Sequence, residues 1–258
     1  VGTENATGSS ARLSAKSNTT TLVSSATNIF DQTATARLRY GDAPLPGPDI
    51  VINIHPDALT SELFFDPDPA SRGTPQQSAV PTNKVDAYSA ILHELGHVFF
   101  FNGFRDDNTY QLLDPTTISP FDSFFEVQGA QPLFNGSNAV AANDGQLVAL
   151  TRNNPYHLGN PGGPGADLVA LLMNGSEFEL GKRYFISTLE RAVVEDLVVA
   201  GTRPPPVIDP DDENPPPDLV ENFSNNFSYT YTGPTGPVTF LIRGTGSGRA
   251  TFPGEGTN

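Results

Sequence analysis

The chain has 258 residues, a formal net charge of −15 and no cysteine. This length allows one sizeable domain, or one domain with a small appendage. The missing thiols exclude disulfides, thiolate metal ligands and cysteine nucleophiles, and the negative charge argues against nucleic-acid binding because phosphate groups would be repelled.

The only methionine is Met173, so the chain does not start at an initiator methionine. We expect a processed or partial form of a longer product, as when a signal peptide is removed. Secreted eukaryotic domains of this size often carry disulfides, and the lack of cysteine therefore favours an extracellular protein of prokaryotic origin. No apolar run approaches the roughly 18 residues that a membrane span needs.

The N-terminal part of the chain changes character twice. Residues 1–20 are rich in Ser, Thr, Asn and Gly, which is typical of a polar arm. The alternation over residues 35–40 predicts a strand, and the apolar run 49–54 predicts a second, more buried strand. Pro-rich loops then follow as far as Pro81.

The clearest helix comes next, with Thr82 or Asn83 as its N-cap and Asp86 in its first turn, where a carboxylate suits the helix dipole. Residues 102–103, Asn-Gly, are the expected stop. Apolar residues recur at helical spacing and predict one buried face, formed by Val85, Tyr88, Ile91, Leu92, Leu95 and Phe99.

The rest of the chain predicts two helices and a separate unit. Helices are expected near residues 166–173 and over 186–200, and they complete a main domain of residues 1–203. Two triple-proline runs flank an acidic stretch and predict a stiff linker at 204–217. Alternating aromatic residues and a Gly-Pro turn predict a small β-hairpin unit at 218–258.

Two histidines stand on the clearest helix, His93 and His97, with Glu94 directly after the first. This spacing places both imidazoles on one helix face, one turn apart, where both can bind a single zinc ion. Glu94 is turned by about 100° from His93, so it can reach a water at the metal without being a ligand. The pattern predicts a zinc centre with Glu94 as the general base.

A catalytic zinc needs a third protein ligand and one open position. The chain has only two other histidines, His55 after the second strand and His157 in a turn-rich loop. A carboxylate on the final predicted helix is the alternative, and it is the ligand type of the gluzincins. The candidates there are Glu190, Glu195 and Asp196.

The order of these features resembles that of the metzincin metalloproteases. The helical His-Glu motif comes first, followed by the distant His157 and then by Met173 ahead of a turn. The compact form of that family continues with a glycine and a third histidine at the positions where this chain has Phe100 and Gly103. The separation of His97 and His157, 157 − 97 = 60 residues, is similar to that of leishmanolysin-like members, in which an insertion precedes the third histidine.

The resemblance implies an α+β fold, a two-lobed zinc peptidase domain with a mixed sheet ahead of the motif helix. It implies zinc ligands at His93, His97 and His157, Glu94 as the general base, and Met173 in a tight turn beneath the metal. The expected function is that of a secreted endopeptidase that hydrolyses polypeptides.

A protein of another class is the second hypothesis: an extracellular filament or surface-layer subunit that retains the peptidase fold. The polar arm and the C-terminal unit are poor independent folders, so we expect them to mediate self-association, for example by strand addition. Calcium is a further candidate cofactor, because Asp106, Asp107, Asp114 and the stretch 209–213 are acidic. None of these stretches has the spacing of a known calcium loop.

Overall fold

The computed structural model divides the chain into two compact units, Val1–Pro205 and Pro206–Asn258. It describes residues 13–17, 20–24, 28–40, 50–67, 79–176, 178–200, 222–233 and 236–247. The predicted linker at 204–217 and residues 1–12 of the predicted polar arm lie outside these described residues.

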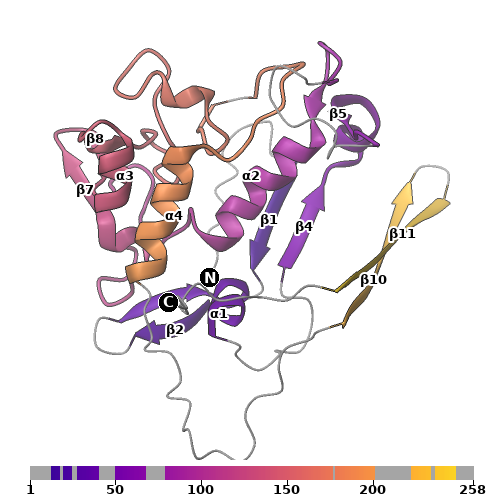
Figure 1. Cartoon of the computed structure of the whole chain (residues 1–258), viewed down its shortest axis with the longest axis horizontal. Coiled ribbons are helices and arrows are strands. Elements are labelled where there is room, and N and C mark those ends of the chain that lie inside the picture. The colour runs from indigo at the N-terminus through magenta and orange to yellow at the C-terminus, as the bar shows by residue number, and fades with distance from the viewer. Residues whose placement is uncertain are drawn as a thin grey trace, which may run out of the picture. The chain divides into compact units, whose positions relative to one another are not determined.

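Helices and short strands mix throughout the first unit (Figure 1), which confirms the predicted α+β class. The helices are α1 (Thr33–Tyr40), α2 (Ala87–Phe99), α3 (Ser137–Ala142) and α4 (Thr188–Ala200), with the π-helical turn η1 (Ala58–Glu62) and the 3-10 turns η4 (Phe121–Phe124) and η5 (Leu168–Ala170). The strands are β1 (Leu13–Ser17), β2 (Thr20–Ser24), β3 (Ile29–Gln32), β4 (Ile50–Ile54), β5 (Leu63–Phe64), β6 (Val85–Asp86), β7 (Phe125–Gln128), β8 (Gln131–Phe134) and β9 (Val148–Ala149). Among the described helices, none has the length and apolar character that crossing a membrane requires.

The described strands of the first unit form four small sheets, so the expectation of one mixed sheet was wrong. β1 pairs antiparallel with β4, β2 antiparallel with β3, β5 parallel with β6, and β7, β8 and β9 form an antiparallel meander. Strands of only two to five residues offer too little backbone for a wide sheet. β4 confirms the strand predicted at 49–54, and its partner β1 comes from the predicted polar arm.

The predicted strand at 35–40 is instead part of helix α1. The alternation of small and larger residues in this segment favours a strand, but the tertiary contacts of the segment favour a helix. Ala36 is fully buried, and the hydroxyl of Thr35 donates to the carbonyl of Phe99 at 3.0 Å. Because Ala favours a helix and the Thr35 hydroxyl serves the end of α2, packing against α2 selects the helical form.

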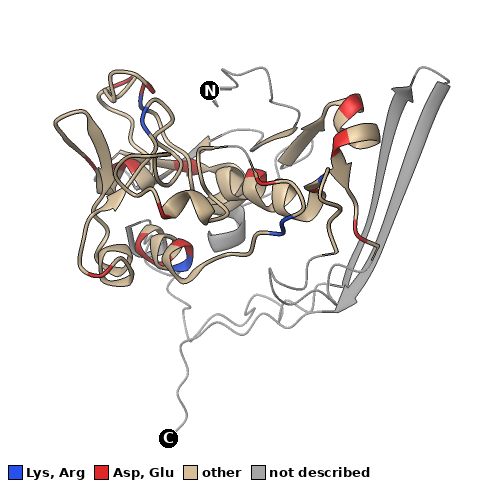
Figure 2. Cartoon of the chain, turned by 90° about the horizontal axis from the view of Figure 1, so that it is seen from above, with Lys and Arg blue, Asp and Glu red and all other residues tan. Residues whose placement is uncertain are grey.

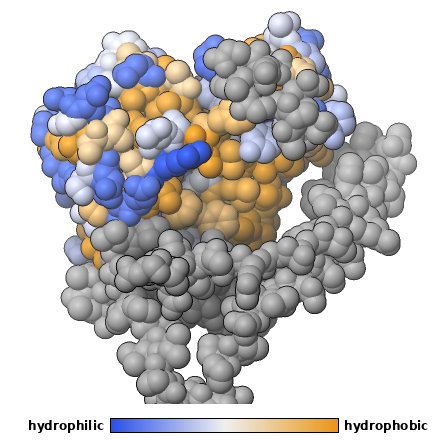
Figure 3. Space-filling model, viewed as in Figure 1, coloured by the Kyte–Doolittle hydropathy of each residue, from blue (hydrophilic) through white to orange (hydrophobic). Residues whose placement is uncertain are grey.

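Helix α2, which carries the His-Glu motif, begins later than expected. Its N-cap is Asp86, whose carboxylate accepts the backbone N–H of Ser89 at 3.1 Å, rather than Thr82 or Asn83. The helix ends at Phe99, just before the predicted stop. α2 lies beside β1 in Figure 1. Figure 3, drawn in the same view, shows hydrophobic surface near the middle of the face that is turned to the viewer.

The helix expected at 166–173 is reduced to the single 3-10 turn η5. The backbone after η5 is used for tertiary bonds: the carbonyl of Met173 accepts the N–H of Leu158 at 2.8 Å, and its N–H donates to Glu190 at 2.6 Å. A helix that continued to residue 173 would direct the Met173 N–H to the carbonyl of residue 169 and would give up the bond to Glu190. α4 confirms the final helix predicted over 186–200.

The main core of the first unit lies around α3 and α4, which pack side by side (Figure 1). It also includes the loop that carries His157 and the segment that carries Met173, so both segments are fixed by apolar burial. Its buried members are Phe101, Phe121, Phe134, Ala139, Val148, Leu150, Leu158, Leu168, Leu172, Met173, Tyr184, Leu189, Val193 and Leu197.

The second unit contains the antiparallel pair β10 (Asn222–Gly233) and β11 (Gly236–Ser247). The register runs from Asn222↔Ser247 to Gly233↔Gly236, so the two strands form one hairpin. This confirms the predicted β-hairpin.

A buried ion pair fixes the start of α2. The guanidinium of Arg183 is fully buried and contacts both carboxylate oxygens of Asp86 at 2.8 and 2.9 Å, and it contacts Asp66 at 3.1 Å. The next residue, Tyr184, donates its N–H to the hydroxyl of Ser89 at 2.7 Å. The segment before α4 is thereby tied to the first turn of the motif helix.

We expect Arg183→Met to lower the free energy of unfolding by about 3–5 kcal/mol, because two buried carboxylates would lose their cation. Urea denaturation measures the change. The control is Lys182→Met, which removes a partly exposed pair with Glu179 and should cost about 1 kcal/mol or less. Equal losses in the two variants would contradict a structural role for the buried pair.

Candidate metal centre

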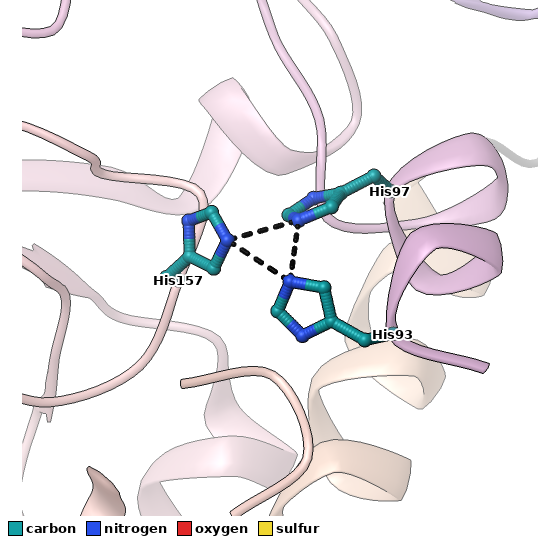
Figure 4. Close-up of side chains that lie close together, drawn as sticks. All are labelled: His93, His97 and His157. Carbon is teal, nitrogen blue, oxygen red and sulfur yellow. Dashed lines mark hydrogen bonds between the residues drawn. The ribbon is translucent and has the colours of Figure 1, made fainter. Parts of the chain in front are cut away.

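Three histidine side chains meet in the first unit, as Figure 4 shows. His93 and His97 come from successive turns of α2, and His157 comes from the loop between β9 and η5. Their Nε2 atoms lie 3.1 Å apart for His93 and His97, 2.9 Å for His97 and His157, and 3.2 Å for His93 and His157. Among the described residues this is the only group of three side chains close enough to hold one metal ion.

The backbone fixes the tautomer of both helical histidines. Nδ1 of His93 lies 2.7 Å from the carbonyl oxygen of Leu172, and Nδ1 of His97 lies 2.8 Å from that of Phe101. A carbonyl oxygen only accepts hydrogen bonds, so Nδ1 carries the proton in each neutral ring and Nε2 presents a lone pair. Metal-binding histidines commonly make this second contact.

Burial keeps the three rings neutral. It lowers the pKa of His93 to about 3, with a further contribution from neighbouring His97. Burial also lowers the pKa of His97, and it lowers that of His157 well below the usual value, with the other two histidines adding to the effect. Burial therefore favours the neutral form of all three rings.

Neutral rings in these tautomers repel each other through their Nε2 lone pairs, and a cation between them would remove the repulsion. The Nε2 atoms of His93 and His97 face each other at 3.1 Å, and both present lone pairs. Two ligands of a tetrahedral zinc lie about 3.3 Å apart, given Zn–N distances of roughly 2.0–2.1 Å, so the observed spacings fit a shared metal. Imidazole also suits copper, iron and nickel, so the three histidines are close enough, and of the right chemistry, to hold a metal ion of this class.

Met173 packs directly beneath the motif helix. It is buried, and a Cβ atom added to Gly96 would overlap its sulfur, so a larger residue at position 96 would force the Met173 side chain to move. Its neighbour Leu172 holds His93 through its carbonyl, and the carbonyl of Met173 holds the N–H of Leu158, next to His157. The segment around Met173 thus supports two of the three rings.

The carboxylates considered as alternative ligands do not join the group. Glu190 is buried and accepts the backbone N–H groups of Met173 and Ser187, each at 2.6 Å. Asp196 is buried and accepts two backbone N–H groups at the start of α3, while Glu195 is exposed. Glu190 therefore supports the Met173 segment in place of binding the metal itself.

Glu94 lies next to the cluster on α2 but is not one of its members. Burial raises the pKa of its carboxyl group to about 7, and a hydrogen bond from the backbone N–H of Ala15 in β1 opposes this rise. A carboxylate with this pKa is a competent proton acceptor near neutral pH. The contact with β1 was not foreseen, because nothing in the sequence pairs residue 15 with residue 94.

The acidic loops use their carboxylates locally. Asp106 accepts the N–H groups of Asn108 and Thr109, and Asp114 accepts that of Thr116, and these bonds lower the pKa of both aspartates. Figure 2 shows the acidic residues scattered over several loops and helices. The acidic stretch 209–213 lies outside the described residues.

The structure brings together the three histidines that the sequence predicts as ligands, but most of their supports are not predictable from the sequence. Two of these supports are backbone carbonyls, which no residue type reveals. Gly96 is the one visible signal, because glycine inside a helix lowers helix stability and suggests close packing. No family model, curated protein or solved structure matches this chain, so the assignment of the site depends on its own geometry.

We expect His157→Ala to lose most of its bound metal, because one of three ligands is removed. Metal analysis after dialysis against zinc measures the effect. His55→Ala is the matched control, since His55 is about half exposed beside Asp57 and lies outside the cluster. Wild-type zinc affinity in the His157 variant would contradict the assignment and reopen the case for Glu190 or Glu195.

Proposed function

We propose that this chain is a secreted, zinc-dependent endopeptidase of the metzincin type, acting on polypeptides. One observation carries the proposal: three neutral imidazoles converge, and a carboxylate with a raised pKa follows the first of them on the same helix. Three histidines are a known ligand set of catalytic zinc. Secretion is proposed from the composition alone.

The residues divide the chemistry between them. His93, His97 and His157 would hold the ion, and zinc supplies, when bound, the Lewis acidity that activates water and polarises a carbonyl group. Glu94 would accept the proton of the attacking water on its carboxylate and return it to the nitrogen of the leaving amine. The raised pKa of Glu94 suits both steps, because the group must take up the proton and release it again.

The surroundings of the cluster support the metzincin type within the zinc peptidases. Met173 lies under the helix at Gly96, and the alternative carboxylate Glu190 is occupied by backbone N–H groups. A compact metzincin site would have its third histidine at position 103. Here Gly103 packs against Tyr156, the residue before His157, and a Cβ atom at position 103 would overlap the tyrosine ring.

We expect Glu94→Gln to keep the metal and the fold but to lower peptide hydrolysis by about 10²–10⁴-fold, because the amide cannot accept the proton. Cleavage of casein or gelatin and the zinc content are measured on the same sample. Glu195→Gln, on the exposed side of α4, is the control and should keep full activity. Near wild-type cleavage by the Glu94 variant would refute the mechanism.

An extracellular assembly subunit is the second candidate function, and the hairpin of the second unit favours it. β10 and β11 pair only with each other among the described strands, so each has an outer edge without a described partner strand. A two-stranded sheet is marginally stable alone, and open edges tend to recruit further strands.

We expect deletion of residues 204–258 to leave zinc binding intact and to abolish any self-association. Light scattering reports the size of both forms, and metal analysis checks the first unit. If the full chain and the shortened chain are equally monomeric, the assembly hypothesis fails and the peptidase proposal stands alone.

A further inference from the structure

Asp122 is a buried carboxylate that the proposed chemistry does not use. Its side chain is fully inaccessible to solvent, and it lies in η4, inside the insertion between His97 and His157. It is not a member of the metal cluster. Burying a charge is costly unless the charge is fully paired, so the partners of this carboxylate indicate what it holds in place.

One oxygen of Asp122 holds the segment that follows α2. Oδ2 accepts the backbone N–H groups of Phe104 and Ser119, both at 2.9 Å. The hydroxyl of Ser119 in turn donates to the carbonyl of Asn102 at 2.9 Å. Residues 102–104 are therefore fixed directly behind Phe101, whose carbonyl orients the ring of His97.

The other oxygen holds the loop that carries the third histidine. Oδ1 accepts the hydroxyl of Tyr156 at 3.0 Å, and it forms an ion pair with Arg105 at 3.1 Å. The same tyrosine hydroxyl accepts the backbone N–H of Arg105 at 2.8 Å. Tyr156 is thus anchored at its far end, and His157 is the next residue along the chain.

We infer that Asp122 is a positioning residue that sets the separation of His97 and His157 by binding both of their supporting segments. One carboxylate holds the peptide behind His97 with Oδ2 and the tyrosine before His157 with Oδ1. The absence of a side chain at Gly103 lets Tyr156 reach this carboxylate. The insertion therefore contributes a clamp that brings the third ligand to the helix.

The inference rests on the metal-binding part of the proposed function and is independent of peptide hydrolysis. Loss of a group that orients metal ligands typically weakens metal binding by about 10–100-fold. A merely structural carboxylate would lower the stability of the fold without a specific effect on metal affinity. The test must therefore compare two buried carboxylates, one of which binds the segments next to the histidines while the other binds a segment elsewhere.

Asp196 provides the matched control. It is buried and accepts the backbone N–H groups of Asn138 and Ala139, both at 2.9 Å, at the start of α3. None of these bonds leads to a segment that carries a histidine of the cluster. Asp122→Asn and Asp196→Asn are therefore the same chemical change at two buried hydrogen-bonding carboxylates.

The experiment measures the affinity of the full chain for zinc and for cobalt(II), by competition with a chromophoric chelator, in the wild type and in Asp122→Asn, Asp196→Asn and Tyr156→Phe. The visible cobalt spectrum reports ligand geometry, and urea denaturation of the metal-free forms reports stability. Tyr156→Phe removes only the hydroxyl, so it carries the test if Asp122→Asn fails to fold.

We expect zinc affinity to fall by about 10–100-fold in Asp122→Asn and Tyr156→Phe, with an altered cobalt spectrum, and to stay at the wild-type value in Asp196→Asn. Wild-type affinity in Tyr156→Phe and in folded Asp122→Asn, or an equal loss in Asp196→Asn, would overturn the positioning role alone. A wild-type chain that binds neither metal would overturn the metal site, and this inference with it.

Discussion

The close contact between the Nε2 atoms of His93 and His97 is the constraint on which the candidate metal site depends. Each ring donates its Nδ1 proton to a backbone carbonyl, so two lone pairs face each other at 3.1 Å in a buried place. Such a contact is repulsive unless positive charge lies beside it, and burial prevents the rings from supplying that charge by protonation. A metal ion bound between the rings would remove the repulsion, and backbone groups of distant segments hold the rings in this arrangement.

The supports surround α2 on several sides and come from distant parts of the chain. Arg183 and Asp86 fix the start of the helix through a buried ion pair. Met173 packs against Gly96 in its middle, and Asp122 holds the segment that follows its end. Because each support is a buried polar group or a close contact, small displacements are costly. A site whose three histidines come from a helix and a distant loop can therefore keep one geometry.

The grouping of the three histidines could be predicted from the sequence, for physical reasons that do not extend to the whole fold. His93 and His97 could be found because helical periodicity is local, and His157 because the chain has so few histidines. The carbonyl acceptors and the role of Asp122 could not be found, since they depend on which distant segments meet. The carboxylate of Glu190, the alternative ligand, instead accepts the backbone N–H of Met173.

The predictions of secondary structure that were wrong have the same origin, namely contacts between distant segments. The alternation at 35–40 predicts a strand, but the hydroxyl of Thr35 donates to the carbonyl of Phe99 at the end of α2, and the segment is helical. Thr82 and Asn83 were plausible helix caps by residue type, yet Asp86 takes that role because its carboxylate also meets the distant Arg183. In each case a tertiary contact outweighs a local preference.

X-ray absorption at the zinc K-edge, on purified wild-type protein supplied with zinc, shows whether the three histidines bind one ion. We expect one zinc per chain, with three imidazole ligands and a further light-atom ligand at about 2.0–2.1 Å. The multiple scattering of imidazole rings distinguishes these ligands from carboxylates. A chain that retains no zinc, or a zinc shell without three imidazoles, would show that the three histidines are not the ligands of a zinc ion.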